Sequence, residues 1–316
     1  IENSYAPPLT EDDFKQIVKK GASIIKDSSC HTLKLLEKGK LGQNSNVMVW
    51  KGTFDNDTVA VKFIWDEMAM HDEIKIYQAL GAIDNPQIEA KGIPKVYYYG
   101  FVLEKYHAIV MTLCDGTLKD RYYQQNKHFD NMSILLIFKR LIEILRFINS
   151  KNVVHNDIRP QNIFLRGKEV FLGDFDISTL DGEQNNYFTE FFASKNAFAG
   201  WERFPMDDLE SLVYTIWFVS SMPNCVGEGE YLLYYFMKGM AEQRVMKKIS
   251  YFKKDEAMYR AFEFAGKDMI SERKIPNYDG IIERLNVAIA VDRSKTGQFQ
   301  FEWLKDSSTS AAVISD

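Results

Sequence analysis

The sequence predicts an α+β protein in two parts, a small antiparallel β-sheet part with one key helix and a larger part made mainly of helices. From residue 32 to residue 110, short β-type runs alternate with Gly, Asn and Asp, which is typical of strands joined by tight turns. Beyond residue 115, apolar residues recur at intervals of three and four, which indicates amphipathic helices. The chain therefore divides near residue 115.

Length and composition are those of a globular protein. The 316 residues are 46% hydrophobic and 26% charged, and this length suits one large domain or two lobes. A formal net charge of −5 argues against a nucleic-acid-binding protein, which usually carries a basic excess. Since charged residues interrupt every apolar stretch before about 20 residues, we expect no membrane span.

The cysteines and histidines suggest neither disulfides nor a metal cluster. The three cysteines, Cys30, Cys114 and Cys225, are odd in number and widely spaced, so we expect free thiols in a reducing compartment. The five histidines show no metal-ligand spacing, and we predict no zinc. We expect an intracellular protein, cytoplasmic or nuclear. Because the sequence starts at Ile1 without a methionine, an upstream targeting segment stays an open question.

The two ends of the chain look different from its middle. Thr10, followed by three acidic residues, resembles a helix start, and we expect a helix to about Lys26 within an N-terminal helical extension over residues 1–31. This helix either packs on the small lobe or recruits a partner. Residues 306–316 are small and polar without periodicity, which predicts a flexible tail.

Between these ends we expect a small lobe over residues 32–114 and a larger lobe over residues 115–305. The predicted strands of the small lobe cover residues 47–50, 59–64, 96–102 and 107–111, and its one helical pattern runs from Glu73 to Leu80. The helical patterns of the larger lobe cover residues 132–150, 208–220, 231–247 and 278–290.

The segment with the most specific chemistry is His155-Asn156-Asp157-Ile158-Arg159-Pro160-Gln161-Asn162, followed by Gly173-Asp174-Phe175-Asp176. Asp157 can accept a proton from a hydroxyl nucleophile. Asn162 and Asp174 offer hard oxygen ligands, which suit Mg²⁺ bound to nucleotide phosphates. The residues between them read as a tight hairpin that turns at Gly167 and brings Asn162 and Asp174 together. The alternative, ordinary surface turn residues, does not explain this ordered set.

This segment resembles the catalytic loop H-R-D-x-K-x-x-N and the D-F-G motif of protein kinases. Upstream, Val59-Ala60-Val61-Lys62 resembles the strand lysine motif, and Glu73 stands where its ion-pair partner is expected. The resemblance implies a bilobal protein kinase-like fold that binds ATP with Mg²⁺ or Mn²⁺. It also implies that Lys62 binds the phosphates of ATP.

The expected phosphate loop, residues 41–49, departs from the glycine-rich pattern G-x-G-x-x-G-x-V. Only Gly42 is kept, while Asn44 and Val47 stand where the second and third glycines would be, so the backbone can approach phosphate less freely. The resemblance nevertheless assigns nucleotide contacts to Leu41, Gly42, Val49, Ala60, Met111, Thr112, Leu113 and Cys114, with Met111 as the gatekeeper.

A second block narrows the resemblance. Ala193-Ser194-Lys195-Asn196, followed by Asp207-Asp208-Leu209-Glu210-Ser211-Leu212, is similar to the casein kinase I and vaccinia-related kinase group, where A-S-I-N replaces A-P-E. Residues 73–77 and Pro276-Asn277-Tyr278 also resemble that group, so the resemblance covers roughly residues 35–290. By analogy, Asp208 holds the backbone of the catalytic loop.

Three departures bear on activity. Asn156 replaces the arginine that reads a phosphorylated activation loop in many kinases, so control by such phosphorylation is less expected. Arg159 replaces the loop lysine and keeps its charge as a planar fork. Asp176 replaces the glycine of D-F-G, which restricts loop flipping; its carboxylate either strengthens the pull on a cation or simply faces solvent.

The resemblance therefore implies a serine/threonine protein kinase. Its catalytic residues would be Asp157, Lys62, Glu73 and Arg159, with the metal held by Asn162 and Asp174. Two alternatives stay open, a pseudokinase that acts as a nucleotide-binding scaffold or regulator, and a small-molecule kinase. The basic stretch over residues 244–254 either docks an acidic protein substrate or is a solvated helix face. The sequence leaves the oligomeric state open.

Overall fold

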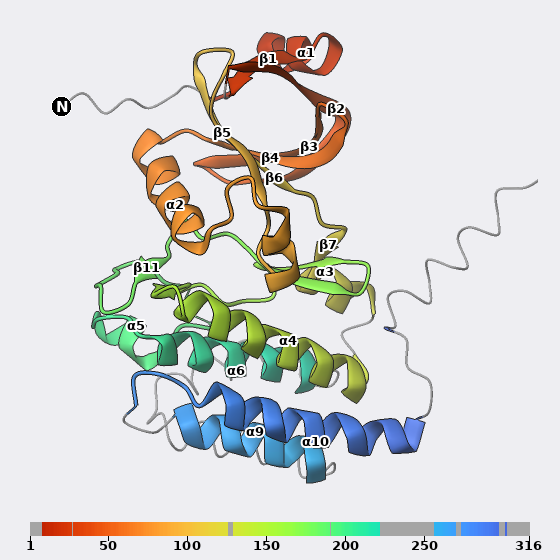
Figure 1. The fold of residues 1–316 in the computed structure, drawn as a ribbon, viewed down its shortest axis with the longest axis vertical. Coiled ribbons are helices and arrows are strands. Elements are labelled where there is room, and N and C mark those ends of the chain that lie inside the picture. The colour runs from red at the N-terminus through yellow and green to blue at the C-terminus, as the bar shows by residue number, and fades with distance from the viewer. Residues whose placement is uncertain are drawn as a thin grey trace, which may run out of the picture. The chain divides into compact units, whose positions relative to one another are not determined.

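A computed structural model describes residues 8–26, 28–125, 129–189, 191–221, 256–269, 273–296 and 301. The expectations for residues 231–247, 244–254 and 306–316 lie outside these ranges. The chain forms two compact units, residues 1–114 and 115–316, which are described one at a time (Figure 1). Cys30 and Cys114 keep their thiols, and Cys225 lies outside the described residues.

The first unit contains a six-stranded antiparallel sheet with the strand order β1-β2-β3-β4-β6-β5, which confirms the predicted sheet (Figure 1). The strands are β1 Ala22–Lys26, β2 Ser29–Gln43, β3 Val47–Phe54, β4 Asp57–Ile64, β5 Val96–Val102 and β6 Tyr106–Thr112. Val61 and Ala108, on β4 and β6, are fully buried in the hydrophobic core of this unit.

The N-terminal helix, α1 Glu11–Lys19, is shorter than predicted. The prediction of a helix to Lys26 is wrong, because Gly21 takes a left-handed φ of +80° and Ala22–Lys26 then pairs with β2 as strand β1. A Cβ atom at Gly21 would also meet Thr32 Cγ2 at 2.9 Å. Both the positive φ and this close approach therefore favour glycine at this position.

Helix α1 packs on the sheet of its own unit. Ile17 is fully buried in the hydrophobic core, and the rings of Phe14 and Trp50 meet edge to face with centroids 4.7 Å apart. Tyr106 Oη donates a hydrogen bond of 2.6 Å to Asp13 Oδ2. Of the two roles left open by the sequence, the structure therefore supports packing on the small sheet.

Helix α2 Glu67–Leu80 starts six residues before the predicted pattern, because Asp66 caps it by accepting from the N–H groups of Met68 and Ala69. It ends at Gly81, whose φ of +69° is left-handed. A short 3₁₀ helix, η1 Pro86–Lys91, follows it. The buried face of α2 contacts β4 and β6 and carries Glu73 inward.

The second unit is mainly helical, as predicted. The helices among its described residues are α3 Leu118–Gln124, α4 Asn131–Asn149, α5 Lys195–Ala199, α6 Pro205–Ser221, α9 Glu256–Met269 and α10 Tyr278–Thr296. Helix α4 packs against α6 and α10, and α9 packs against α6 and α10, so these helices form a stack (Figure 1). Among the helices of the described ranges, none has the length and apolar character needed to cross a membrane.

Short strands of the second unit carry the loops of interest. They are β7 Gly116–Thr117, β8 Val153–Val154, β9 Ile163–Arg166, β10 Glu169–Leu172 and β11 Thr179–Leu180. Strands β9 and β10 form the predicted hairpin, with Gly167 at a φ of +55° in the turn. Strand β8 pairs with β11, which fixes the chain on either side of the catalytic-loop segment.

Candidate active site

In the first unit, Lys62 on β4 and Glu73 on α2 form a buried ion pair. Lys62 Nζ lies 2.8 Å from Glu73 Oε2, and the two side chains are 8% and 1% exposed. Burying either charge alone would be costly, so each keeps the other ionised. The pair holds an ammonium group in a fixed position on the sheet, where it can bind an anion.

The register of the sheet aligns several of the predicted nucleotide-binding residues. Gly42 on β2 is opposite Val49 on β3, which is opposite Lys62 on β4. Ala60 lies two residues before Lys62 and opposite Met111 on β6. Since residues opposite one another and residues two apart share a face of a sheet, these five residues lie on one face.

Other predicted nucleotide-binding residues are arranged differently. Leu41 lies at an irregularity of the β2–β3 register, and its side chain is exposed. Thr112 Oγ1 donates to Glu89 Oε1 at 2.6 Å and accepts from the backbone N–H of Lys95 at 2.9 Å. The hydroxyl of Thr112 therefore has a structural role. Leu113 is half-buried at the end of the unit, beside Cys114.

The β2–β3 turn, residues 44–47, is closed by its own asparagine. Asn44 Oδ1 accepts from the backbone N–H groups of Asn46 and Val47, both at 2.8 Å. The N–H of Asn44 donates to the carbonyl of Val47 at 2.9 Å. Three of the four backbone N–H groups of this turn are thus already hydrogen-bonded within it. Where a glycine-rich turn presents these groups to phosphate, this turn uses them internally.

In the second unit, the catalytic-loop segment is held by a buried carboxylate on α6. Asp208 accepts from the N–H of His155 at 2.7 Å and from the N–H of Asn156 at 2.9 Å, one on each oxygen. Complete burial raises the pKa of Asp208 to about 7, although both N–H groups oppose the shift. Asp208 therefore fixes the loop backbone, the role that the resemblance assigned to it.

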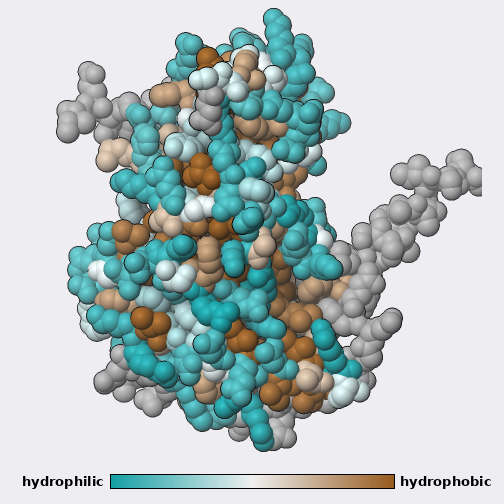
Figure 2. Space-filling view, in the orientation of Figure 1, coloured by the Kyte–Doolittle hydropathy of each residue, from teal (hydrophilic) through white to brown (hydrophobic). Residues whose placement is uncertain are grey.

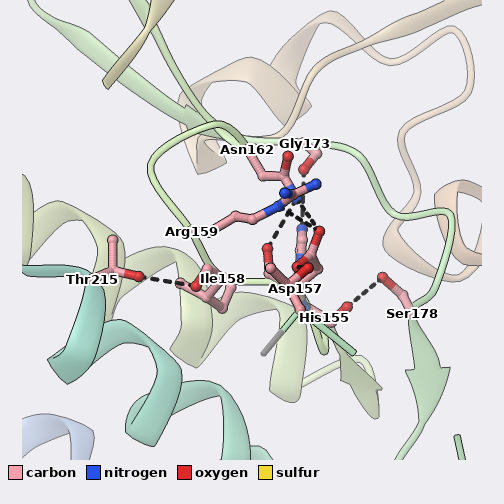
Figure 3. Close-up of polar contacts among 9 residues, drawn as sticks. His155, Asp157, Ile158, Arg159, Asn162, Gly173, Ser178 and Thr215 are labelled. Carbon is pink, nitrogen blue, oxygen red and sulfur yellow. Dashed lines mark hydrogen bonds and ion pairs between the residues drawn. The ribbon is translucent and has the colours of Figure 1, made fainter. Parts of the chain in front are cut away.

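The side chain of His155 braces the loop from inside. Its pKa is lowered because the ring is fully buried, which favours the neutral form. The N–H of Asp157 donates to His155 Nδ1 at 3.2 Å, so Nε2 carries the proton and donates to the carbonyl of Gly173 at 3.0 Å (Figure 3). The histidine thereby ties Asp157 to the segment before Asp174.

Asp157 stands at the centre of a small polar cluster (Figure 3). Its Oδ2 accepts from Arg159 Nε at 2.8 Å and from Asn162 Nδ2 at 2.7 Å. Its Oδ1 accepts from Thr189 Oγ1 at 2.6 Å. The carboxylate is therefore oriented by a guanidinium and an amide on one oxygen, while the other oxygen faces a hydroxyl group.

The β9–β10 hairpin brings the two predicted metal ligands onto neighbouring chain segments. The N–H of Gly173 donates to the carbonyl of Asn162 at 3.1 Å, one residue before Asp174. Because Asn162 Nδ2 is bonded to Asp157, its Oδ1 is the side-chain atom with which it can coordinate a cation. Asp174 is half-buried with a left-handed φ of +65°, and Asp176 is exposed.

Asn156, which replaces the arginine of the kinase pattern, binds the segment after Asp174. Its Nδ2 donates to the carbonyl of Ile177 at 3.0 Å and to Thr179 Oγ1 at 2.9 Å. Ser178 Oγ donates to the carbonyl of His155 at 3.1 Å (Figure 3). Uncharged side chains therefore hold residues 177–179, which directly follow Asp174-Phe175-Asp176.

Sequence reasoning missed two residues of the second unit. Thr189 contacts Asp157, and the only signal for it was its place four residues before Ala193 of the A-S-K-N block. Arg203 is 1% exposed and donates to the carbonyls of Asn185 at 2.6 Å and Trp201 at 3.0 Å. A lone arginine in a loop gives no sequence signal of burial.

Comparisons with known proteins relate this chain to protein kinases. A family model described as the protein kinase domain matches residues 35–204. A probable casein kinase I homologue of Encephalitozoon cuniculi (strain GB-M1) is 25% identical over 201 residues, which are 57% of this chain and 63% of that protein. The chain thus spans less than two thirds of the length of this curated relative.

A solved structure of vaccinia related kinase 3 matches with a TM-score of 0.64 and 15% identity, covering 89% of this chain and 95% of that chain. This likeness supports the fold alone. The family model carries the assignment further, because it spans more than half of the chain and includes the Lys62–Glu73 pair and the catalytic-loop segment. This chain belongs to the protein kinase family.

Proposed function

We propose that this chain is an ATP-dependent protein kinase that transfers the γ-phosphoryl group to serine or threonine hydroxyls of protein substrates. The observation that carries the proposal is the carboxylate of Asp157, which is buried, oriented on Oδ2 by Arg159 and Asn162, and hydrogen-bonded on Oδ1 to a hydroxyl. Phosphoryl transfer depends mainly on such positioning and on charge neutralisation.

Asp157 would accept the proton of the substrate hydroxyl. A hydroxyl group, that of Thr189, already lies 2.6 Å from Asp157 Oδ1, so this oxygen can receive the hydrogen bond that an acceptor serine or threonine would make. Arg159 and Asn162 keep the other oxygen occupied, which fixes the plane of the carboxylate. Arg159 also keeps positive charge beside the proposed site of transfer.

The chain offers donors that fit Mg²⁺-ATP. Lys62, held by Glu73, would bind the α and β phosphates, and Asn162 Oδ1 with the Asp174 carboxylate would hold Mg²⁺ or Mn²⁺ through hard oxygen ligands. When bound, the metal would neutralise charge on the phosphates. The sheet face that carries Gly42, Val49, Ala60 and Met111, all predicted nucleotide contacts, completes the proposed nucleotide site of the first unit.

The closed β2–β3 turn favours a second candidate, a pseudokinase that binds partners through a kinase fold. Three N–H groups of the turn are already hydrogen-bonded, so the turn contributes little to binding phosphate. The oriented Asp157 cluster favours the active kinase, because a scaffold has no need of it.

The finer assignments also belong to this proposal. We propose that residues 32–114 form the small lobe and residues 115–305 the larger lobe of one kinase domain. By likeness to casein kinase I, we expect action on protein substrates inside the cell, in the cytoplasm or the nucleus.

The test is phosphate incorporation from labelled ATP into the protein itself and into casein, with Mg²⁺ or Mn²⁺, for the wild type and Asp157→Asn. We expect incorporation by the wild type alone. A thermal shift with Mg²⁺-ATP, measured on both proteins, reports nucleotide binding independently of transfer. Nucleotide binding without transfer to any acceptor, equal in both proteins, would favour the pseudokinase.

A further inference from the structure

Strand β2 is bulged directly before the expected phosphate loop. On one side of the bulge, Leu35 is opposite Gly52. On the other side, seven residues along β2 but only three along β3, Gly42 is opposite Val49. Strand β2 therefore has four residues more than β3 over this interval. Because a bulge re-aims the chain that follows it, the position of residues 41–43 depends on what holds this bulge.

The bulge is held by the indole ring of Trp50 on β3. Trp50 Nε1 donates to the carbonyl of Leu36 at 2.5 Å. Gly39 is buried and its backbone lies against the same ring, since a Cβ atom there would meet Trp50 Nε1 at 2.8 Å. The same Cβ atom would meet the carbonyl of Lys51 at 2.7 Å. The bulged residues are therefore packed around one side chain, with a hydrogen bond at their start and a close approach at Gly39.

Helix α1 covers the same indole ring. The rings of Phe14 and Trp50 meet edge to face with centroids 4.7 Å apart, and both side chains pack against the hydrophobic core of the first unit. Figure 1 shows α1 beside β1 and β2, and Figure 2 shows mainly hydrophilic side chains at the surface where α1 lies. The helix thus turns its apolar residues toward the sheet, and Trp50 links it to the bulge.

Polar contacts fix the start of α1 on a different part of the sheet. Asp13 Oδ2 accepts from Tyr106 Oη at 2.6 Å. The same oxygen lies 2.7 Å from both Lys105 Nζ and Thr10 Oγ1. Tyr106 belongs to β6, which is two strands away from β3 in the sheet order. The position of α1 over the indole ring therefore depends on contacts outside β2 and β3.

Trp50 also borders the proposed nucleotide site. It directly follows Val49, which is opposite Gly42 on one side and Lys62 on the other. Because successive residues of a strand point to opposite faces, Val49 lies on the predicted nucleotide face and Trp50 on the core face under α1. A shift of Trp50 therefore moves Val49 with it, and a change in the bulge moves Gly42.

We propose that Trp50 is a positioning residue through which the docking of α1 controls nucleotide affinity. When α1 is docked, Phe14 holds the indole ring, and the ring holds the bulge. The bulge in turn keeps Gly42 and Val49 in register. When α1 is displaced, the bulge loosens and this sheet face binds nucleotide more weakly. The inference rests on the proposed function and names a way in which its nucleotide site is regulated.

Calorimetry with Mg²⁺-ATP and with adenosine, on the full chain, tests this proposal. Trp50→Phe keeps a ring against α1 but removes the donor to Leu36, and Phe14→Ala removes the ring of α1. Each should weaken the binding of both ligands about 2- to 10-fold, the equivalent of about one hydrogen bond. Adenosine should lose as much as Mg²⁺-ATP, because three N–H groups of the β2–β3 turn are already hydrogen-bonded within it.

Two further variants separate this coupling from a general loss of stability. Asp13→Ala removes the polar anchor of α1 and should also weaken both ligands. The matched control is Tyr98→Ala, which removes a partly buried ring that packs on the same core from β5, three strands away from β3. It should lower the melting temperature as Phe14→Ala does, while both affinities stay at the wild-type values. Phe14→Tyr, which keeps the ring on α1, should bind both ligands as the wild type does.

Hydrogen exchange of the backbone N–H groups separates this proposal from the proposed function, because it needs no nucleotide. Residues 36–43 should exchange about 2- to 10-fold faster in Trp50→Phe, Phe14→Ala and Asp13→Ala, and at the wild-type rate in Tyr98→Ala.

Unchanged exchange and affinity in the three variants would overturn the proposal and leave the proposed function standing. The proposal would also fall if Tyr98→Ala weakened nucleotide binding as much as Phe14→Ala. If the wild type binds neither ligand, the proposed function fails, while faster exchange in the three variants still supports the link from α1 to the bulge.

Discussion

In both the catalytic-loop segment and the β2–β3 turn, one side chain accepts hydrogen bonds from two backbone N–H groups. The two regions differ in the polar groups that they leave available to a ligand. In the catalytic loop, the acceptor is Asp208 from α6, and the carboxylate of Asp157 stays oriented for chemistry. In the turn, the acceptor is Asn44 of the turn itself, so its own N–H groups are used up.

The difference teaches that preorganisation by itself does not make a binding site. A loop fixed from outside keeps its own polar groups for a ligand, while a turn fixed from within uses them. The kinase pattern is therefore kept where Asp208 supports it and weakened at Asn44, and the following variants test this contrast.

The largest effect is expected at Asp157. Asp157→Asn should lower phosphoryl transfer about 10²- to 10⁴-fold, because the amide cannot accept the proton of the hydroxyl. Initial rates with labelled ATP measure this, and the melting temperature should change little. Asp176→Asn, an exposed acid nearby, serves as the control with a near-normal rate. A normal rate in Asp157→Asn would remove the proposed base.

The Lys62–Glu73 pair should show the largest effect on stability. Lys62→Met leaves the buried carboxylate of Glu73 without its cation, which costs about 3–5 kcal/mol of unfolding free energy. Urea unfolding measures this cost, and Lys62→Met combined with Glu73→Leu should recover much of it. Lys75→Met, on the exposed side of α2, should change stability by less than about 0.5 kcal/mol. Equal costs at both lysines would contradict the buried pair.

Asp208→Asn should lower the unfolding free energy by about 1–3 kcal/mol, because an amide has one acceptor oxygen for two buried N–H groups.

The contribution of Asp208 to the unfolding free energy depends on pH with a definite sign. Burial raises the pKa of Asp208 from 3.8 to about 7, so between these values the folded state binds more protons than the unfolded state. The contribution of Asp208 to stability therefore falls as pH rises through this window.

Unfolding measured from pH 5 to pH 7.5 tests that sign. The advantage of the wild type over Asp208→Asn should shrink as pH rises, since asparagine does not titrate. An advantage that grew with pH would mean that the two N–H groups, and not burial, decide the pKa of Asp208.

The smallest effect is expected at the turn. Asn44→Gly removes the acceptor of the Asn46 and Val47 N–H groups, so these donors become available to phosphate. We expect Mg²⁺-ATP to bind about 2- to 10-fold more tightly, the equivalent of about one hydrogen bond, while adenosine binds as before. Calorimetry measures both, with Ser45→Gly as the control for flexibility. Weaker binding would show that Asn44 shapes the turn for phosphate.

Local patterns predicted much of the fold. The helix of residues 131–149 and the β9–β10 hairpin follow from periodicity and a turn glycine, within a residue or two of the observed bounds. The predicted extent of the N-terminal helix was wrong beyond Gly21, because residues 22–26 form strand β1 by pairing with β2. The pattern of residues 22–26 alone did not separate a strand from a continued helix.

By itself, the sequence determined the order and chemistry of the candidate site, since the residue types and spacings around Asp157, Asn162 and Asp174 are local. Only the tertiary structure decided which partner each polar group takes. Thr189 reaches Asp157 across 32 residues, and Asp208 reaches His155 across 53. Such contacts depend on packing between distant segments and on burial, which strengthens hydrogen bonds and shifts pKa values, and no local pattern encodes them.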